Sequence, residues 1–213
     1  MINSEHRSYF NRYYRDYAAQ NPLKKLEFYL DIIRRNSGDF RFLFEIGFGK
    51  GLFLKHAASA GFNVCGCDID SEAILKTKAL LPDIRLFKGE FQSVDIKKFQ
   101  IIVAFDVVEH ISNVRALFKS VFDRLEPGGV FLFICPVYDG PQGVVTRTLD
   151  RDETHLHKES RFWWLKLAEE SGFRIVKWTG VFRYLLPWKK MLHYEMKGVL
   201  KFTSPAISVV CKK

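Results

Sequence analysis

FRFLFEIGFGKG, residues 40–51, joins a run of aromatic and branched residues to three glycines at alternate positions. The apolar run over 40–48 predicts a buried strand, and the apolar spacing over 50–61 predicts a helix that ends at Gly61. A strand that turns through glycines into a helix is the opening unit of an α/β sheet. Ligands of such sheets bind at the carboxyl ends of the strands, so this loop is the first candidate for a binding site.

The rest of the chain continues the same alternation. Further strands are predicted at 62–69, 83–89, 99–108, 130–137, 173–183 and 206–212. Helices are predicted at 23–36, 71–81, 113–125 and 160–171, with Ser71 as the N-cap of the second of these. Strands that alternate with helices indicate a doubly wound, mostly parallel sheet with helices on both faces. We expect seven strands, the last one antiparallel.

Length and composition favour one globular α/β domain over residues 1–213. Of the 213 residues, 47% are hydrophobic and 27% are charged, which excludes a disordered chain. Residues 1–38 are predicted to form an N-terminal helical cap. The four cysteines lie in apolar runs without metal-binding spacing, so we expect buried, reduced thiols. The sequence shows neither a secretory signal nor a transmembrane segment, which predicts a cytoplasmic protein.

Charge is concentrated at the two ends of the chain. The net charge is +9, of which residues 1–41 carry +3 (8 basic, 5 acidic) and residues 181–213 carry +6 (7 basic, 1 acidic). Residues 181–204 interleave these cations with aromatic side chains and form a predicted insertion on the acceptor side. Such a segment can stack bases and hold phosphates, so nucleic acid is one possible partner. It can also dock an amphipathic substrate at a membrane surface, or be a helical insertion packed on the sheet.

The spacing in the loop points to a ligand without phosphates. The pattern is G-x-G-x-G, whereas a dinucleotide pyrophosphate needs G-x-G-x-x-G. Glu45, two residues before the first glycine, repels a phosphate and attracts an ammonium group. Asp68 ends the second strand, where a carboxylate can accept hydrogen bonds from ribose hydroxyls. Glu90 follows the third strand, and Asp106 ends the fourth. These positions suit a ligand with an adenine, a ribose and a cationic amino-acid end.

Five motifs occur in order: EIGFGKG (45–51), CDID (67–70), KGEFQSVD (88–95), FDVVEHI (105–111) and LEPGGVFLFICP (125–136). Together they resemble class I S-adenosylmethionine-dependent methyltransferases, most of all the type 11 group, over about residues 40–180. Lys50 departs from the Thr or Ser frequent in this family. The resemblance implies S-adenosylmethionine as the cofactor, with S-adenosylhomocysteine as the product. The residues that it implies for cofactor binding are Glu45, Gly47, Gly49 and Gly51 at the methionine portion, Asp68 at the ribose, Ile69, Glu90 and Phe91 at the adenine, and Asp106 at the methionine amino group.

Histidines after the fourth and fifth strands are the candidates for acid–base chemistry. His110 follows the fourth strand, and His155 and His157 lie in the long loop after the fifth. An unperturbed histidine titrates near pH 6.5, so His110 and His155 are predicted as the catalytic residues. Asp106-x-x-Glu109-His110 with His155 also resembles the Glu-x-x-Glu-His plus His metal site of two methyltransferase groups. Because Asp replaces the first Glu, and because a purely structural Glu-His pair is an open alternative, no metal site is predicted, although a divalent metal is considered.

The expected function is methyl transfer to a small-molecule or glycan-like acceptor, with oxygen as the acceptor atom. One of the two metal-site groups methylates precursors of ubiquinone and the other caps the terminal ribose of small RNAs. An RNA ribose 2'-O-methyltransferase that binds nucleic acid through the basic C-terminal segment is therefore one alternative. A protein that binds the cofactor without catalysis is the second alternative.

Overall fold

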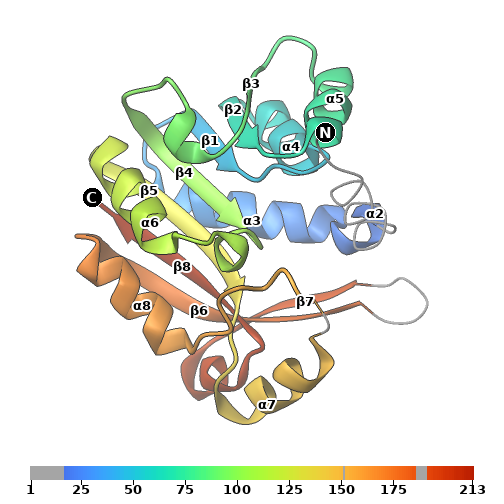
Figure 1. The fold of residues 1–213 in the computed structure, drawn as a ribbon, viewed down its shortest axis with the longest axis vertical. Coiled ribbons are helices and arrows are strands. Elements are labelled where there is room, and N and C mark those ends of the chain that lie inside the picture. The colour runs from blue at the N-terminus through green and yellow to red at the C-terminus, as the bar shows by residue number, and fades with distance from the viewer. Residues whose placement is uncertain (1–16, 151, 186–190) are drawn as a thin grey trace.

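The computed structural model describes residues 17–150, 152–185 and 191–213, which build one eight-stranded sheet (Figure 1). The strand order is β3-β2-β1-β4-β5-β8-β6-β7. Strands β1 to β5 run parallel, β8 is antiparallel to both β5 and β6, and β7 is antiparallel to β6. The strands are β1 (Phe42–Ile46), β2 (Asn63–Asp68), β3 (Arg85–Lys88), β4 (Phe99–Phe105), β5 (Leu125–Pro136), β6 (Arg174–Leu185), β7 (Met191–Met196) and β8 (Ala206–Lys212).

The expectation of seven strands is wrong by one, because residues 181–204 contain a strand. β6 extends to Leu185 and β7 returns beside it, pairing Phe182 with Tyr194 and Tyr184 with Leu192. In both strands large apolar side chains recur at every second residue, which is the period of a β-strand, and the segment forms a hairpin accordingly. The helical interpretation of this segment is therefore wrong, apart from a 3-10 turn, η3 (Gly198–Thr203). Lys189 and Lys190 lie outside the described residues.

Helices cover both faces of the sheet, which confirms the doubly wound architecture (Figure 1). α6 and α8 pack on one face, while α3 and α4 pack on the other. Helix α7, which follows β5, is not among the helices predicted from the sequence. The helices are α2 (Tyr17–Gln20), α3 (Leu23–Asn36), α4 (Leu52–Ser59), α5 (Ser71–Leu80), α6 (Val114–Arg124), α7 (Gly140–Leu149) and α8 (Arg161–Glu170). Two further 3-10 turns are η1 (Phe91–Ser93) and η2 (Val108–His110).

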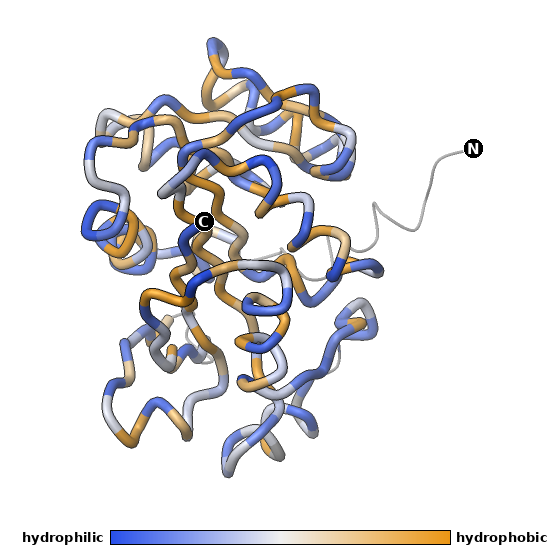
Figure 2. The backbone as a smooth tube through the Cα atoms, turned by 90° about the vertical axis from the view of Figure 1, so that its left-hand side faces the viewer, coloured by the Kyte–Doolittle hydropathy of each residue, from blue (hydrophilic) through white to orange (hydrophobic). Residues whose placement is uncertain are grey.

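Two hydrophobic clusters, one on each side of the sheet, form the core. Trp164 of α8 and Phe118 of α6 are fully buried on one side. Leu30 and Ile33 of α3 lie with Leu54 of α4 on the other. In Figure 2 the hydrophobic strands run through the centre of the molecule while hydrophilic segments lie outside. Since burying one such side chain stabilises the fold by roughly 1.5–3 kcal/mol, these two clusters fix the strands whose ends carry the candidate site.

The turn after β2 is capped one residue earlier than predicted. Asp70 is the N-cap of α5, and its side chain accepts a hydrogen bond from the backbone N–H of Glu72 at 2.8 Å. Ser71 is instead the first helical residue, so its predicted capping role is wrong. The longer reach of the carboxylate across the first turn satisfies a free N–H at this end. The cap fixes the path of the chain directly after Asp68.

Three further predictions from the sequence concern the cysteines, the N-terminal helices and membrane-spanning segments. Cys65, Cys67, Cys135 and Cys211 are free and buried, as predicted. Of the expected cap over 1–38, residues 1–16 lie outside the described residues, while α2 and α3 confirm helices in the remainder. Within the described ranges, no helix combines the length and the apolar character needed to cross a membrane.

Candidate functional site

A cavity of about 550 Å³ opens at the carboxyl ends of the parallel strands. Its volume is in the range of small-molecule sites, and its position is the one expected for a doubly wound sheet. Of the predicted site residues, those in its lining are Gly47, Gly49, Asp68, Ile69, Glu90, Phe91, Asp106 and His110. Glu45, Gly51 and His155 lie outside this lining. The other lining residues include Glu153, Thr154 and Leu156, from the loop after α7.

The glycine loop between β1 and α4 lies against its neighbours too closely for side chains. Gly47 has φ of 70°, and a Cβ there would lie 2.4 Å from the Cγ2 of Val107. Gly49 has φ of 55°, and a Cβ there would lie 2.7 Å from the hydroxyl of Tyr17. Such backbone angles disfavour other residues, so the loop requires glycine on two grounds. Gly51 is the N-cap of α4 and is buried outside the cavity lining.

Asp68 connects the glycine loop to the end of β2. Its Oδ2 accepts a hydrogen bond from the backbone N–H of Gly49 at 2.9 Å, and its Oδ1 accepts one from the N–H of Asp70, also at 2.9 Å. Burial raises the pKa of this carboxyl to about 6, although these hydrogen bonds act in the opposite direction. Each carboxylate oxygen has a second lone pair, so Asp68 can still accept hydrogen bonds from a ligand.

Glu45 is a buried acid in the middle of the sheet, behind the loop. It is 4% exposed, and its Oε2 atom has no hydrogen-bond partner. Burial, together with the nearby charge of Asp68, raises the pKa of Glu45 well above its usual value. An unpartnered buried carboxyl oxygen is costly, because it has lost its hydration without gaining another partner. Glu45 is therefore suited to a donor that reaches it from the loop side.

The far end of the cavity has an apolar floor and an acidic rim. Ile69 is 59% exposed and lines the cavity, as does Glu90. Phe91 is 1% exposed and packs edge-on against Phe44, with 5.5 Å between the ring centroids. Arg124 fixes this turn by donating a hydrogen bond to the carbonyl of Phe91 at 2.8 Å. A flat apolar group with polar edges, such as a purine, fits this combination of side chains.

Asp106, at the end of β4, already has two cationic partners. Arg183 of β6 donates a hydrogen bond to its Oδ1, and the Nζ of Lys25 on α3 lies 3.7 Å from its Oδ2. Burial raises the pKa of Asp106, but these two cations outweigh burial and lower it to about 2. Asp106 has φ of 58°, an angle uncommon for a residue other than glycine. Its predicted partner, the amino group of methionine, stays a prediction, and that group would have to compete with both cations.

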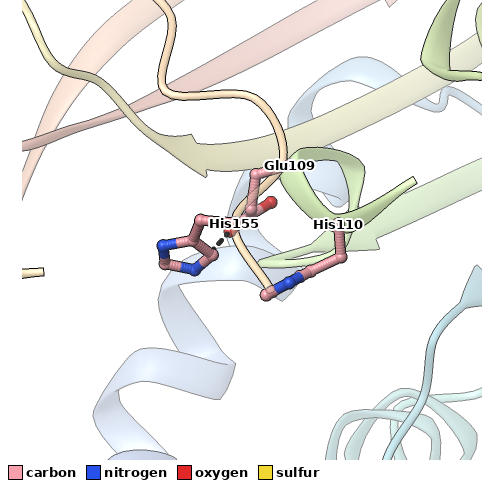
Figure 3. A group of neighbouring side chains, drawn as sticks. All are labelled: Glu109, His110 and His155. Atoms are coloured by element: carbon pink, nitrogen blue, oxygen red, sulfur yellow. Dashed lines mark ion pairs between the residues drawn. The ribbon is translucent and has the colours of Figure 1, made fainter. Parts of the chain in front are cut away.

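Glu109, His110 and His155 come together beside the cavity (Figure 3). The first two belong to η2, and His155 belongs to the loop after α7. The His155 Nε2 atom lies 4.0 Å from Glu109 Oε1, and the two imidazole ring centroids are 4.7 Å apart. The backbone N–H groups of Leu156 and His157 donate to the Glu109 carbonyl at 3.0 and 3.1 Å, which holds the loop against η2. The three side chains form one cluster, hereafter the Glu–His cluster.

The environment of the Glu–His cluster alters the pKa of two members. Burial raises the pKa of Glu109 well above its usual value, and the charge of Asp106 adds to this. Its Oε2 atom is buried without a hydrogen-bond partner. Burial, and then the charge of His155, lower the pKa of His110. His110 is therefore neutral at pH 7, and its Nδ1 lies 2.9 Å from the hydroxyl of Thr154.

The structure also separates residues that the sequence grouped together. His157 directs its Nε2 to the carbonyl of Ile111 at 2.9 Å and stacks on Trp163, so it is turned away from the Glu–His cluster. Among the described residues, the group with metal-binding geometry contains Glu109, His110 and His155, with one ligand atom each within 4.8 Å of the others. Asp106, the first residue of the suggested metal motif, is outside this group and faces Arg183 instead.

Three charged residues that contact the candidate site were missed by sequence reasoning. Lys25 and Arg183 neutralise Asp106 from elements distant in sequence, and Asp150 contacts His155 from behind, with 2.8 Å between Asp150 Oδ2 and His155 Nδ1. The basic and aromatic pattern around Arg183 was recognised, but nothing in it indicates a partner 77 residues earlier. No pattern in the sequence singles out Asp150 or Lys25.

Comparison with known proteins agrees with this geometry. The family model described as a methyltransferase domain matches residues 9–177, more than half of the chain. A protein of Mycolicibacterium smegmatis named "Probable S-adenosylmethionine-dependent methyltransferase" is 26% identical over 148 residues, which are 67% of this chain and 55% of that protein. The ubiquinone biosynthesis O-methyltransferase of Paramagnetospirillum magneticum is 30% identical over 96 residues, 42% of this chain and 38% of that protein. The chain spans about half the length, or less, of the curated relatives that it matches.

Solved structures give the same fold. An S-adenosylmethionine-dependent methyltransferase from Clostridium acetobutylicum superposes with a TM-score of 0.71 at 17% identity, covering 97% of this chain and 98% of that one. A Thermotoga maritima structure, described as a possible histamine N-methyltransferase, gives 0.71 at 12% identity, with 96% and 98% coverage. The chain therefore belongs to the methyltransferase domain family, and within it to the class I S-adenosylmethionine-dependent methyltransferases.

Proposed function

We propose that this protein transfers a methyl group from S-adenosylmethionine to a hydroxyl oxygen of a small molecule. The observation that carries the proposal is the continuity of the cavity with the Glu–His cluster: His110 lines the same cavity as Gly47, Gly49 and Asp68. Distant similarity to ubiquinone biosynthesis O-methyltransferases supports oxygen as the acceptor atom.

The residues present fit the cofactor. The adenine would lie over Phe91 between Ile69 and Glu90, and Asp68 would accept from the ribose hydroxyls. The backbone of Gly47 and Gly49 would approach the methionine portion, with Glu45 and Asp106 as acidic groups near its ammonium, whereas Gly51 lies outside the cavity lining. Glu45 strengthens this fit, because its buried Oε2 atom lacks a partner. When bound, S-adenosylmethionine supplies an electrophilic methyl group, so the protein has to align the acceptor and accept its proton.

The Glu–His cluster is placed to accept that proton. His110 reaches the cavity, and its lowered pKa leaves the imidazole neutral at pH 7, with a lone pair available. His155 lies beside it, with 4.7 Å between the ring centroids, and the His155 Nε2 is 4.0 Å from Glu109 Oε1. General-base help of this kind contributes about 10²–10⁴-fold to the rate, whereas alignment in the cavity supplies the larger part.

A divalent metal ion is a second way in which the Glu–His cluster could act on the hydroxyl. The donor set of one carboxylate and two imidazoles suits a first-row divalent ion, and the unpartnered Oε2 of Glu109 offers a free ligand atom. A bound ion lowers the pKa of a coordinated hydroxyl. Loss of methyl transfer with a chelator, restored by Mg²⁺ or Mn²⁺, would support this route. Transfer that is indifferent to the chelator would leave the histidines as the base.

Contacts of the basic segment favour a small molecule over RNA. Arg183 pairs with Asp106, Lys197 with Glu195 at 2.9 Å, and Lys201 lies 3.7 Å from the ring centroid of Trp178. Of these three cations, Arg183 is the one that a phosphate could reach only by breaking an ion pair with a side chain that is mostly buried. An RNA ribose acceptor would instead require a steep salt dependence of binding.

The test is methyl transfer from labelled S-adenosylmethionine to a fractionated cell extract. We expect label in a small-molecule fraction, and none with His110→Ala, a variant that should still bind the cofactor. Asp68→Ala is the matched control, since it should lose cofactor binding as well. Label in the RNA fraction would overturn the proposed acceptor class, and undiminished transfer by His110→Ala would overturn its role as the base.

A further inference from the structure

Asp150 contacts the side of the His155 ring that faces away from Glu109. Its Oδ2 atom lies 2.8 Å from His155 Nδ1, while His155 Nε2 lies 4.0 Å from Glu109 Oε1. The ring thus has the Asp150 carboxyl at Nδ1 and two carboxyl groups, those of Glu109 and Asp152, near Nε2. Asp150 is the C-cap of α7, five residues before His155, and it does not line the cavity.

These contacts decide which nitrogen of His155 carries the proton. Tyr138 donates its hydroxyl proton to Asp150 Oδ2 at 2.5 Å, and its oxygen lies 3.0 Å from His155 Nδ1. Nδ1 therefore faces two acceptors, a carboxylate and a phenol oxygen whose proton is already used. A protonated Nδ1 can donate to both, whereas an unprotonated one would face a carboxylate lone pair. A neutral His155 then has its lone pair on Nε2, on the side of Glu109.

Asp150 is itself held in position. Besides Tyr138, the ammonium of Lys158 lies 3.0 Å from its Oδ2, and the backbone N–H of Asp152 donates to its Oδ1 at 3.0 Å. Tyr138 is 6% exposed and lies two residues after the end of β5, so it ties Asp150 to the sheet. The carboxylate is thereby oriented by a strand, although it lies at the start of a loop.

We propose that Asp150 is a positioning residue for methyl transfer, which holds His155 with its proton on Nδ1 so that the lone pair of Nε2 faces Glu109. This inference rests on the proposed function, because it assigns His155 a use in that reaction. Carboxylates that orient a histidine through its second nitrogen fix both tautomer and ring orientation in catalytic and metal sites. Tyr138 would hold Asp150, and Asp150 would hold His155, so Asp150 itself would touch neither cofactor nor acceptor.

The first measurement is the tautomer of His155 in the wild-type protein, by ¹⁵N NMR of labelled imidazoles. The His155 signals are assigned from those lost in His155→Gln. We expect the Nδ1–H form when the ring is neutral. A ring with its proton on Nε2 would overturn the inference without affecting the proposed function.

The second measurement compares Asp150→Asn with Asp152→Asn, a matched change of charge in the same loop. Asp152 Oδ2 lies 3.9 Å from His155 Nε2, so Asp152 approaches the opposite nitrogen. We expect only Asp150→Asn to shift His155 toward the Nε2–H form. Its initial rate of label transfer at saturating S-adenosylmethionine should fall about 10- to 100-fold, with the dissociation constant of the cofactor unchanged. An unchanged tautomer and rate in a folded Asp150→Asn would overturn the inference.

The two proposals fail in different ways. If the acceptor fraction takes up label at an equal rate with His155→Gln, the use of His155 is overturned while methyl transfer stands. If no hydroxyl acceptor takes up label but His155 shows the Nδ1–H form, the proposed function is overturned, and the orientation of His155 by Asp150 is supported as a property of the fold.

Discussion

The two halves of the cavity are built in opposite ways. The half that we propose for the cofactor, hereafter the cofactor half, consists of residues at the carboxyl ends of the parallel strands β1, β2 and β3, and backbone groups hold it together, as in the bond from the Gly49 N–H to Asp68 at 2.9 Å. The half that we propose for the acceptor, hereafter the acceptor half, consists of side chains brought together from distant segments, such as His155 with Glu109. It also includes the pair of Arg183 with Asp106, whose carboxylate we also propose near the cofactor ammonium. The first half therefore depends on backbone conformation, and the second on pairs of charges. Substitutions in the cofactor half should therefore act through backbone strain and cofactor affinity. Substitutions in the acceptor half should act through the stability that charge pairs contribute.

Arg183→Met should have the largest effect and break the acceptor half. It removes the main partner of Asp106 and leaves that carboxylate with Lys25 alone. Breaking a fully buried ion pair costs about 3–5 kcal/mol of unfolding free energy, and we expect less here because the side chains of Arg183 and Asp106 are 18% and 32% exposed. Denaturant unfolding measures this change. Arg115→Met is the control, since its pair with Glu170 is on the surface, with the Arg115 side chain 61% exposed, and such pairs contribute about 0–1 kcal/mol.

Gly47→Ala should break the cofactor half through the backbone. A left-handed angle costs a residue with a Cβ roughly 1–2 kcal/mol, and the overlap with Val107 adds to this. We expect lower thermal stability together with lost cofactor binding, measured by calorimetry. Gly61→Ala is a matched control, because Gly61 has φ of 88° with nothing within 4 Å of its Cβ position. If both variants bind the cofactor equally, the close approach at Gly47 has no role in binding.

Asp68→Ala should weaken cofactor binding and leave the acceptor half intact. A hydrogen bond to a charged group contributes about 1.5–3 kcal/mol, so the dissociation constant should rise roughly 10- to 150-fold. Titration with S-adenosylhomocysteine measures this, and the ¹⁵N signals of His155 should stay in place. An unchanged dissociation constant would contradict the assignment of Asp68 to the ribose.

The pH dependence of cofactor binding should be the smallest effect and sharpen the comparison. The pKa of Asp68 is raised to about 6, so its charged form, the better acceptor, is lost as the pH falls through 6. Affinity for S-adenosylhomocysteine should therefore rise from pH 5 to pH 7 and level off above it, by less than tenfold per pH unit. Asp68→Asn should remove this slope. A slope that persists in Asp68→Asn would have to come from another group.

Folding itself has a separate pH dependence at Asp106, which belongs to the acceptor half. Its pKa is lowered to about 2 by Arg183 and Lys25, below that of an unfolded chain. A carboxyl with a lowered pKa stabilises the folded state above its unfolded pKa of about 3.9, and this contribution is lost as the pH falls toward 2. Arg183→Met should therefore flatten the acid limb of a plot of unfolding free energy against pH.

The acceptor half also shows where sequence reasoning stopped. His110 and His155 were identified because histidines after strands suit acid–base chemistry, and the structure brings their ring centroids within 4.7 Å. Their protonation could not be predicted, because it depends on Thr154, Asp150 and Tyr138, whose positions come from folding. Most of β6 was predicted, as the strand at 173–183, but β7 was not, because the mixed basic and aromatic residues of 181–204 fit several structures, a helical insertion among them. Pairing with β6 and β8 decided among these structures.

The sequence by itself determined the doubly wound sheet, the glycine loop and the acidic residues at the strand ends. Periodicity and strand-end position are local properties, and parallel strands bring their carboxyl ends to one edge whatever else the chain does. Tertiary structure alone decided the partners of Asp106, the eighth strand and the contact of Asp150 with His155. These features depend on residues far apart in sequence, such as Arg183 and Asp106, which are 77 residues apart. The attraction between such charges becomes strong only when the folded chain has removed water from around them.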